Sequence, residues 1–227
     1  MWAIIKKEFK SYFLSPIGYV VVGILLFVSS VFFYLTSIQR GTVDIGSLYY
    51  YIALYGLIIV SPILTMRMFA EERKSGTEQL LLTTPISITK VVFGKLIAAL
   101  GVIMVAIVIS LGYFVIVSFL AKASIAPVIT SILGFILVSI AALSVGMFAS
   151  SITENQLISA ILTIAFLLMS LFMENISSVF KNLSIMSYYQ KFPAGLVSLT
   201  EIAGLVSFSI VFISLTILFM QRRKSYK

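Results

Sequence analysis

Histidine and cysteine are both missing from the 227 residues, and aspartate occurs once, as Asp44. Without histidine or cysteine, the chain cannot build a Ser-His or Cys-His nucleophilic site, a disulfide, or a zinc site of the usual His/Cys kind. A single aspartate also excludes an aspartyl-protease dyad within one chain. A lysine or glutamate site at a membrane interface is the catalytic option that remains, so we expect a protein that is not itself an enzyme.

Charge is also scarce. Only 11% of the residues are charged, against about 25% in typical soluble domains. Hydrophobic residues make up 60% of the chain, and the mean hydropathy is +1.14. A soluble fold of this size would expose large apolar patches and aggregate. We therefore expect lipid to be the solvent for most of the chain.

Six apolar segments are long enough to cross a bilayer, which takes about 20 residues. They are Pro16–Ile38, Leu48–Met66, Val91–Leu120, Ala126–Ala149, Leu157–Met173 and Ile202–Met220. We find no internal repeat and no separate soluble domain. The sequence therefore predicts an all-α membrane protein with six transmembrane helices that form a single transmembrane domain over residues 1–227.

The net charge of +8 reflects sixteen basic and eight acidic residues. With an even number of spans, both termini lie on one side of the membrane. That side would carry twelve of the sixteen basic residues, and the other side would carry four, namely Arg40, Lys122, Lys181 and Lys191. This bias places both termini in the cytoplasm by the positive-inside rule and predicts a multi-pass protein of the plasma (inner) membrane. We attribute the basic excess to topology and anionic lipid rather than to nucleic acid.

The first fifteen residues have an amphipathic pattern. At 100° per residue, the apolar side chains fall on one arc, made of Trp2, Ile5, Phe9, Tyr12 and Phe13. Such a pattern is typical of a helix that lies along the membrane interface, and Pro16 suits a bend into the first span. The helix is either a simple membrane anchor or a docking surface for a cytoplasmic partner.

The connection between the second and third spans, residues 67–90, mixes both charge signs. Ser75 and Glu78 have the spacing of a capping box, and Thr77 is a competing N-cap. These signals predict a short helix over Thr77–Thr84 that ends before Pro85. Its leucines at 80–82 have no bilayer to cross. They fit insertion into a partner's groove, or packing against the chain's own helices.

This connection resembles a known family. The run from Glu71 to Ser87, with its Glu-Glu, basic pair, Gly-Thr, leucines and Pro-x-Ser, is similar to the corresponding loop of type-2 ABC exporter permeases. Three further features resemble that family: the Ile-Ile-Lys-Lys-Glu-Phe start, Lys95 at the entry of the third span, and Ser151–Gln156. The segment Phe13–Tyr19 resembles most the gliding-motility-associated subgroup.

The resemblance implies that the chain is half of a dimeric channel, completed by a second copy or a paralogue and driven by a cytoplasmic ABC ATPase that binds ATP and Mg²⁺. No cofactor is then expected in this chain. The interfacial helix, a coupling helix in the 67–90 connection and short external helices in the 174–201 connection would be family features. By this resemblance the ATPase-coupling residues are Glu71, Glu72, Arg73, Lys74, Gly76, Thr77, Glu78, Leu81 and Glu154. Those from Glu71 to Glu78 form the transmission segment, and the region around Glu154 makes a second contact.

The chain has no ATP site of its own. A phosphate-binding loop needs Gly-x-x-x-x-Gly-Lys-Ser/Thr, because backbone N–H groups and the lysine must surround the phosphates. At the single Gly-Lys pair, Gly94-Lys95, the earlier glycine position holds Thr89 and the next residue is Leu96. Any ATP hydrolysis therefore belongs to another polypeptide.

Beyond their cytoplasmic ends, none of the spans contains a central Asp, Glu, Lys or Arg, which argues against an ion-coupled carrier. In the fourth span, Ala142, Gly146 and Ser150 recur at four-residue spacing and predict a close helix approach. In the 174–201 connection, Pro193 and Gly195 interrupt an apolar run and predict one or two short helices. An ATPase-independent carrier or channel and a membrane scaffold remain alternatives to the exporter subunit, and the cargo is not specified.

Overall fold

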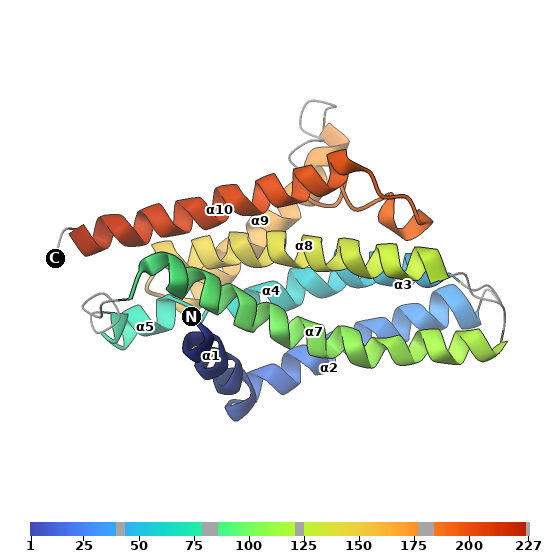
Figure 1. Cartoon of the computed structure of the whole chain (residues 1–227), viewed down its shortest axis with the longest axis horizontal. Coiled ribbons are helices and arrows are strands. Elements are labelled where there is room, and N and C mark those ends of the chain that lie inside the picture. The colour runs from blue at the N-terminus through green and yellow to red at the C-terminus, as the bar shows by residue number, and fades with distance from the viewer. Residues whose placement is uncertain (40–43, 79–85, 121–124, 177–183, 226–227) are drawn as a thin grey trace.

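The computed structural model of the chain describes residues 1–39, 44–78, 86–120, 125–176 and 184–225 (Figure 1). Helices dominate these residues, and no strand occurs among them. Six helical stretches are long and apolar enough to cross a membrane: Ile17–Ile38, Ile45–Lys74, Ile88–Ile116, Ile125–Ile152, Gln156–Met173 and Leu199–Arg223. The predicted all-α architecture with six spans is therefore confirmed.

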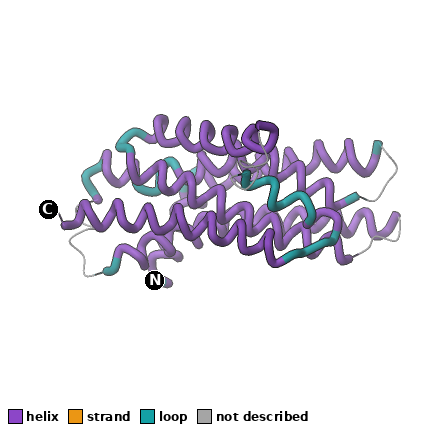
Figure 2. The backbone as a smooth tube through the Cα atoms, turned by 90° about the horizontal axis from the view of Figure 1, so that it is seen from above, coloured by secondary structure: helices purple, strands orange, loops and turns teal. Residues whose placement is uncertain are grey.

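Several of these stretches join more than one helical element. The elements are α1 (Trp2–Leu14), α2 (Ile17–Phe33), the π-helix η1 (Tyr34–Ile38), α3 (Ile45–Tyr51), the π-helix η2 (Ile52–Gly56), α4 (Leu57–Thr65), α5 (Ala70–Lys74), α7 (Ile88–Leu120), α8 (Ile125–Ile152), α9 (Gln156–Ile176), the 3₁₀-helix η4 (Phe192–Ala194) and α10 (Leu199–Ser225). Figure 2 shows the long helices running side by side along the length of the molecule.

The second span begins three residues earlier than the hydropathy pattern predicts. Asp44 is the N-cap of α3: its carboxylate accepts a hydrogen bond from the backbone N–H of Ser47 at 2.9 Å and another from the Ser47 hydroxyl at 2.6 Å. An N-cap aspartate satisfies an amide that would otherwise lack a partner at the helix start. Capping, rather than hydrophobicity, therefore sets this boundary.

Helix α8 is the centre of the bundle, in contact with α3, α4, α7, α9 and α10. Small residues line its buried surface, among them Ala142, Ser139, Ser144 and Gly146. Ser139 and Ser144 donate to the carbonyls of Phe135 and Ala141 on their own helix. Because these hydroxyls form hydrogen bonds within their own helix, neighbouring helices can pack closely without leaving them unpaired.

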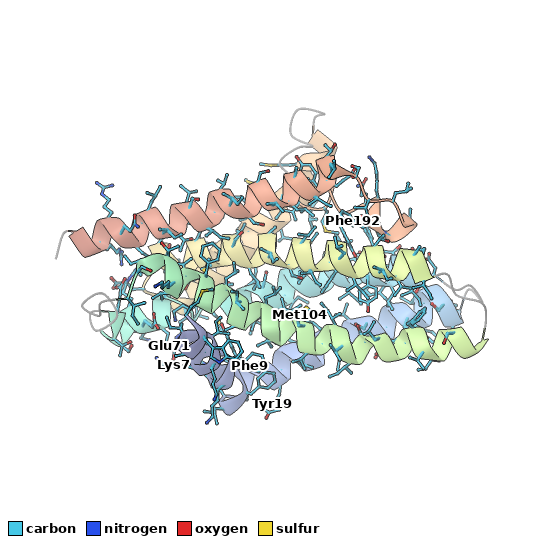
Figure 3. All side chains as sticks on the ribbon, viewed as in Figure 1. Lys7, Phe9, Tyr19, Glu71, Met104 and Phe192 are labelled. Atoms are coloured by element: carbon cyan, nitrogen blue, oxygen red, sulfur yellow. The ribbon has the colours of Figure 1, made fainter. Side chains whose placement is uncertain are left out.

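The connection between α9 and α10 folds back onto the bundle. Residues 185–191 form turns and lead into η4. The Tyr189 hydroxyl donates to the Ser131 carbonyl at 2.9 Å, and Thr130 donates to the Phe192 carbonyl at 2.8 Å, so the segment is attached to α8, as Figure 3 shows for Phe192. Between residues 184 and 198, the helical element present is the single 3₁₀ turn η4, where one or two short helices were predicted. Gly195, in the left-handed conformation at φ +81°, ends this turn. Residues 177–183 lie outside the described residues.

Glycines make this docking possible. An added Cβ at Gly46 would lie 2.2 Å from the Pro193 carbonyl oxygen, and one at Gly134 would lie 2.6 Å from the rings of Phe192 and Tyr189. Backbone therefore approaches backbone where α3 meets η4, and only glycine leaves room for it.

We expect Gly46→Ala to destabilise the protein by about 1–3 kcal/mol, since the new methyl group must push the Pro193 backbone away. Thermal unfolding of the purified protein in detergent measures this effect. Gly23→Ala is the matched control, because nothing lies within 4 Å of its added Cβ. Equal melting temperatures for the two variants would contradict the proposed tight fit.

Candidate functional site

Charged side chains gather at one end of the bundle, where the N-terminus, α5 and the C-terminal end of α10 lie together (Figure 1). We call this group the charged end cluster. Its members are Glu8, Glu72, Arg73, Glu78, Lys95 and Arg223. They come from α1, α5, the turn after α5, α7 and α10, so the cluster joins segments far apart in the sequence.

Lys95 is the most buried charge of the cluster, with 3% of its side chain exposed. Its ammonium group donates to Glu8 of α1 at 3.2 Å and to Glu72 of α5 at 2.7 Å. It also lies 5.5 Å from the centre of the Phe69 ring, a favourable distance for a cation over an aromatic face. A single buried cation on α7 therefore holds both α1 and α5.

Arg73 makes the second connection of the cluster. Its guanidinium lies 3.3 Å from the Glu78 carboxylate and donates to the carbonyl of Thr153 at 3.0 Å and to that of Ser151. Arg223 of α10 lies 3.6 Å from the other oxygen of Glu78. Arg73 thus ties α5 to the connection between α8 and α9, and Glu78 ties it to α10.

The remaining charges of this region are half-buried or exposed. Arg67 and Glu71 pair one helical turn apart with 33% and 40% of their side chains exposed, and such pairs contribute little to stability. Lys74 and Glu154 are also exposed. The charges that join separate helices thus range from 3% exposed at Lys95 to 32% at Arg223, whereas Lys74 and Glu154 are exposed.

The second span is interrupted between α4 and α5. A side chain of α8 forms hydrogen bonds with the backbone groups at this break. The Ser150 hydroxyl accepts hydrogen bonds from the backbone N–H groups of Phe69 and Ala70, both at 3.1 Å, and lies 3.4 Å from the Met66 carbonyl. One turn earlier on α8, an added Cβ at Gly146 would lie 2.2 Å from the Thr65 hydroxyl. The predicted close approach at Gly146 and Ser150 is confirmed, and it positions the start of α5.

Helix α1 lies across this end of the bundle. Ile4 packs on Gly94 and Phe9 packs on Gly101, both on α7. The buried Tyr12 hydroxyl donates to the Leu64 carbonyl at 3.1 Å, near the end of α4. Burial, and then the charge of Glu8, raise the pKa of Tyr12 well above its usual value, so this donor stays protonated.

The predicted apolar face of α1 divides into two parts. Ile5, Phe9 and Phe13 are half-buried against the bundle, whereas Trp2 is 76% exposed. The apolar arc therefore serves protein packing as well as any contact with lipid, which the hydrophobic pattern alone did not distinguish.

The turn after α5 differs from the sequence prediction. Ser75 is the C-cap of α5, with its backbone N–H donating to the Glu71 carbonyl, and Glu78 pairs with arginines. The predicted Ser75–Glu78 capping box is therefore wrong. Gly76 has φ +74°, and the Thr77 hydroxyl donates to the Glu72 carbonyl at 3.2 Å. Leu81 and the rest of the predicted Thr77–Thr84 helix from residue 79 onward lie outside the described residues.

A cavity of about 650 Å³ lies between α1, the Arg67–Thr77 segment and α7. Lys7 and Glu71 both line it and lie close together in the view of Figure 3, and Glu8, Glu72 and Lys95 also line it. Both charge signs surround this space. In the part of the chain that is described, no three acidic side chains come close enough to hold a metal ion.

The family resemblance pointed to Glu71–Lys74, which form most of α5, but not to the residues that hold this segment. Glu8, Arg223 and Ser150 were not among the expected coupling residues. Ser150 contacts Phe69 and Ala70, Arg223 contacts Glu78, and Glu8 shares Lys95 with Glu72. One signal was available: Lys95 is a charge inside an apolar stretch and must find a counter-charge.

A comparison with protein-family models matches residues 50–224 to the family described as ABC-2 family transporter protein. A search of curated proteins found no match. The matched range includes α5, Lys95, Ser150 and Arg223 and leaves out α1.

We expect Lys95→Met to destabilise the protein strongly, by about 3–5 kcal/mol, because Glu8 and Glu72 would lose their shared buried cation. Lys90→Met, at an exposed position on the same helix, is the matched control and should change stability by less than about 0.5 kcal/mol. Thermal unfolding in detergent compares the two variants. A Lys95→Met protein as stable as the control would rule out a structural role for this pair.

We expect Ser150→Ala to cost about 1–2 kcal/mol, since two amides at the start of α5 would lose their acceptor. Ser118→Ala is the control, because that exposed hydroxyl donates to the Val115 carbonyl of its own helix. Hydrogen exchange at Phe69 and Ala70 should accelerate in Ser150→Ala and stay unchanged in Ser118→Ala. Unchanged exchange in both would contradict the assignment.

Proposed function

The chain belongs to the ABC-2 transporter family, and on that premise we propose that it couples ATP hydrolysis by a separate ATPase subunit to export across the plasma (inner) membrane. As a member of the family it is a multi-pass membrane permease, not itself catalytic, and it associates with an ABC ATPase. The observation that carries the coupling proposal is the charged end cluster, since it connects one short helix, α5, to four other segments of the bundle.

We place the charged end cluster on the cytoplasmic side. The N-terminus, α5 and the C-terminal end of α10 lie at the same end of the bundle (Figure 1), and that end carries most of the lysines and arginines. Lysine and arginine favour the cytoplasmic side of a membrane. ATP and Mg²⁺ are then bound by the ATPase subunit beneath α5, and this chain binds neither.

Transmission from α5 to the membrane follows the contacts of its charged residues. A displacement of α5 by the ATPase moves Glu72, and with it Lys95 on α7 and Glu8 on α1. The same displacement moves Arg73, which holds the carbonyls of Ser151 and Thr153 between α8 and α9. Because separating a buried ion pair is costly, α5 and these segments move together rather than slip past each other.

The accessible residues of the same region are the proposed ATPase contacts. Lys74, Gly76 and Thr77 are exposed around the turn, the half-buried Glu71 lies beside them at the cavity, and Glu154 is exposed in the neighbouring α8–α9 connection. Leu81, in the sequence that follows, completes the proposed contact. Placement in the gliding-motility-associated subgroup, and the choice between a second copy and a paralogue as dimer partner, stay predictions.

Affinity purification from native membranes in mild detergent, followed by mass spectrometry, tests the proposed function. We expect a soluble ABC ATPase in stoichiometric amount, and Glu72→Arg should remove it, because a second cation beside Lys95 would displace α5. A chain that purifies alone even after cross-linking in the membrane would contradict the exporter-subunit proposal and favour a carrier, channel or scaffold.

We also expect Gly76→Pro to uncouple the ATPase. Proline fixes φ near −65° and removes the N–H that Gly76, at φ +74°, donates to the Arg73 carbonyl. The complex should still assemble, while the ATPase subunit within it hydrolyses ATP at the rate of the isolated subunit. Gly76→Asn is the control, since asparagine tolerates the left-handed conformation. Identical stimulation by the two variants would show that this turn transmits nothing.

A further inference from the structure

Helix α10 has charged residues only near its two ends. The Arg223 guanidinium lies 3.6 Å from the Glu78 carboxylate in the charged end cluster, and Glu201 lies 2.7 Å from the Lys191 ammonium group at the opposite end. Residues 202–221 contain no charged side chain. Because an α-helix rises about 1.5 Å per residue, the two contacts are about 33 Å apart. Figure 1 shows α10 running beside α8 between these two ends of the bundle.

Glu78 connects α10 to the turn after α5. Its side chain is 9% exposed and contacts two arginines, Arg73 of α5 at 3.3 Å and Arg223 of α10 at 3.6 Å. The Arg223 guanidinium also lies 5.0 Å from the centre of the Phe219 ring, one turn earlier on α10, and this contact holds the cation against its own helix. Removing a cation from a buried carboxylate is costly. A displacement of the turn therefore reaches α10 through Glu78.

The opposite end of α10 is attached to the α9–α10 connection. Glu201 accepts hydrogen bonds from the backbone N–H of Ser198 at 3.1 Å and from the Ser198 hydroxyl, in addition to its ion pair with Lys191. The Tyr188 ring packs so closely on the start of α10 that an added Cβ at Gly204 would lie 2.3 Å from it. This part of the connection therefore follows the start of α10 when the helix moves.

The same connection is also attached to α8. The Thr130 hydroxyl of α8 donates to the Phe192 carbonyl at 2.8 Å. Residues 193–197 thus lie between an attachment to α8 at Phe192 and an attachment to α10 at Ser198. Gly195, at φ +81°, lies within this segment, and a glycine backbone changes conformation at little steric cost. A shift of α10 relative to α8 therefore changes the conformation of residues 193–197.

The packing of α10 on α8 permits such a shift. The buried apolar and hydroxyl residues of α10 form one stripe, made of Leu205, Ser209, Ile213, Thr216 and Met220. The Ser209 and Thr216 hydroxyls donate to the carbonyls of Leu205 and Phe212 on α10 itself. Within the described part of the chain, neither hydroxyl bonds to another helix. Packed helices can move past each other by small sliding displacements, and here no hydrogen bond from this stripe has to break.

We propose that α10 is a transmission helix. A displacement of the turn after α5 moves Arg223 through Glu78, slides α10 along α8, and changes the conformation of residues 193–197 at the opposite end of the bundle. Arg223 is the positioning residue of this route. The inference rests on the proposed function and adds to it, since the contacts of Glu72 and Arg73 lead to α1, α7 and the α8–α9 connection but not to α10.

Cysteine labelling of the complete permease–ATPase complex in nanodiscs tests this inference. The chain contains no cysteine, so Ala194→Cys places a single exposed thiol within residues 193–197, and Ser118→Cys places one at an exposed position of α7. The probe is N-ethylmaleimide, and mass spectrometry of permease peptides gives the labelling rate without nucleotide and after trapping with ATP, Mg²⁺ and vanadate. We expect trapping to change the rate at Ala194→Cys about threefold, because helix shifts of about 1–2 Å alter the exposure of this segment. The rate at Ser118→Cys should stay unchanged.

Variants in the Ala194→Cys background identify the route. Arg223→Gln removes the cation at the charged end cluster and should abolish the nucleotide-dependent change in labelling rate, and Glu78→Gln should do the same from the other side of the pair. Arg223→Lys keeps the charge and should retain the change. Lys90→Gln removes a charge from an exposed position of α7 and is the matched control, which should also behave as the parent protein does.

Three results would overturn the inference while leaving the proposed function intact. The first is a labelling rate at Ala194→Cys that does not depend on nucleotide, or a change of equal size at Ser118→Cys. The second is an unchanged response in Arg223→Gln and Glu78→Gln, or the same loss in Arg223→Lys as in Arg223→Gln. The third is loss of the ATPase from Arg223→Gln, because Arg223 then belongs to the ATPase contact.

Co-purification of the ATPase and the amount of trapped nucleotide are scored in the same samples. A parent complex that retains its ATPase and traps nucleotide, but shows one of these three results, refutes the role of α10 alone. Absence of the ATPase from the parent preparation refutes the proposed function instead, and the inference with it.

Discussion

Lys95 must find negative charge, because its ammonium group lies on a largely apolar helix with 3% of the side chain exposed. Two carboxylates supply that charge, and each belongs to a different helix. Glu8 brings in α1 and Glu72 brings in α5. A buried ion that lost its partners would cost several kcal/mol. The relative positions of α1, α5 and α7 therefore depend on this one shared interaction.

A second constraint acts on the backbone of the second span. Lipid offers no hydrogen bonds, so a break in a membrane helix is tolerated only where protein satisfies it. The Ser150 hydroxyl accepts hydrogen bonds from the backbone N–H groups of Phe69 and Ala70, and the Tyr12 hydroxyl donates to the Leu64 carbonyl. The break separates the rigid membrane part of the span from α5. In our proposal, α5 can be moved by an ATPase because the break is there, and it moves other helices because of its ion pairs.

The two ends of the molecule use different chemistry. At the end that holds the termini, charge pairs connect α5 with the long helices. At the other end, glycines allow the α9–α10 connection to reach α3 and α8, and aromatic rings continue from that connection to the surface of the first two spans. In the proposed function, the ATPase acts on the end that holds the termini. The long helices α7 and α8 run between both ends and are the physical link.

The sequence by itself determined the six spans, the amphipathic α1 and the family resemblance of the residue 67–90 connection, because hydropathy, helical periodicity and motif spacing are local properties. It did not determine the partners of Lys95, which are 87 and 23 residues away. It also misassigned Ser75 and Glu78, because Arg73 and Arg223 compete for the glutamate more strongly than a backbone amide does. The ring contacts Phe32–Tyr51 and Tyr50–Tyr189 likewise join residues that only helix packing brings together. The tertiary structure decided these contacts, since burial and charge compensation depend on which helices meet.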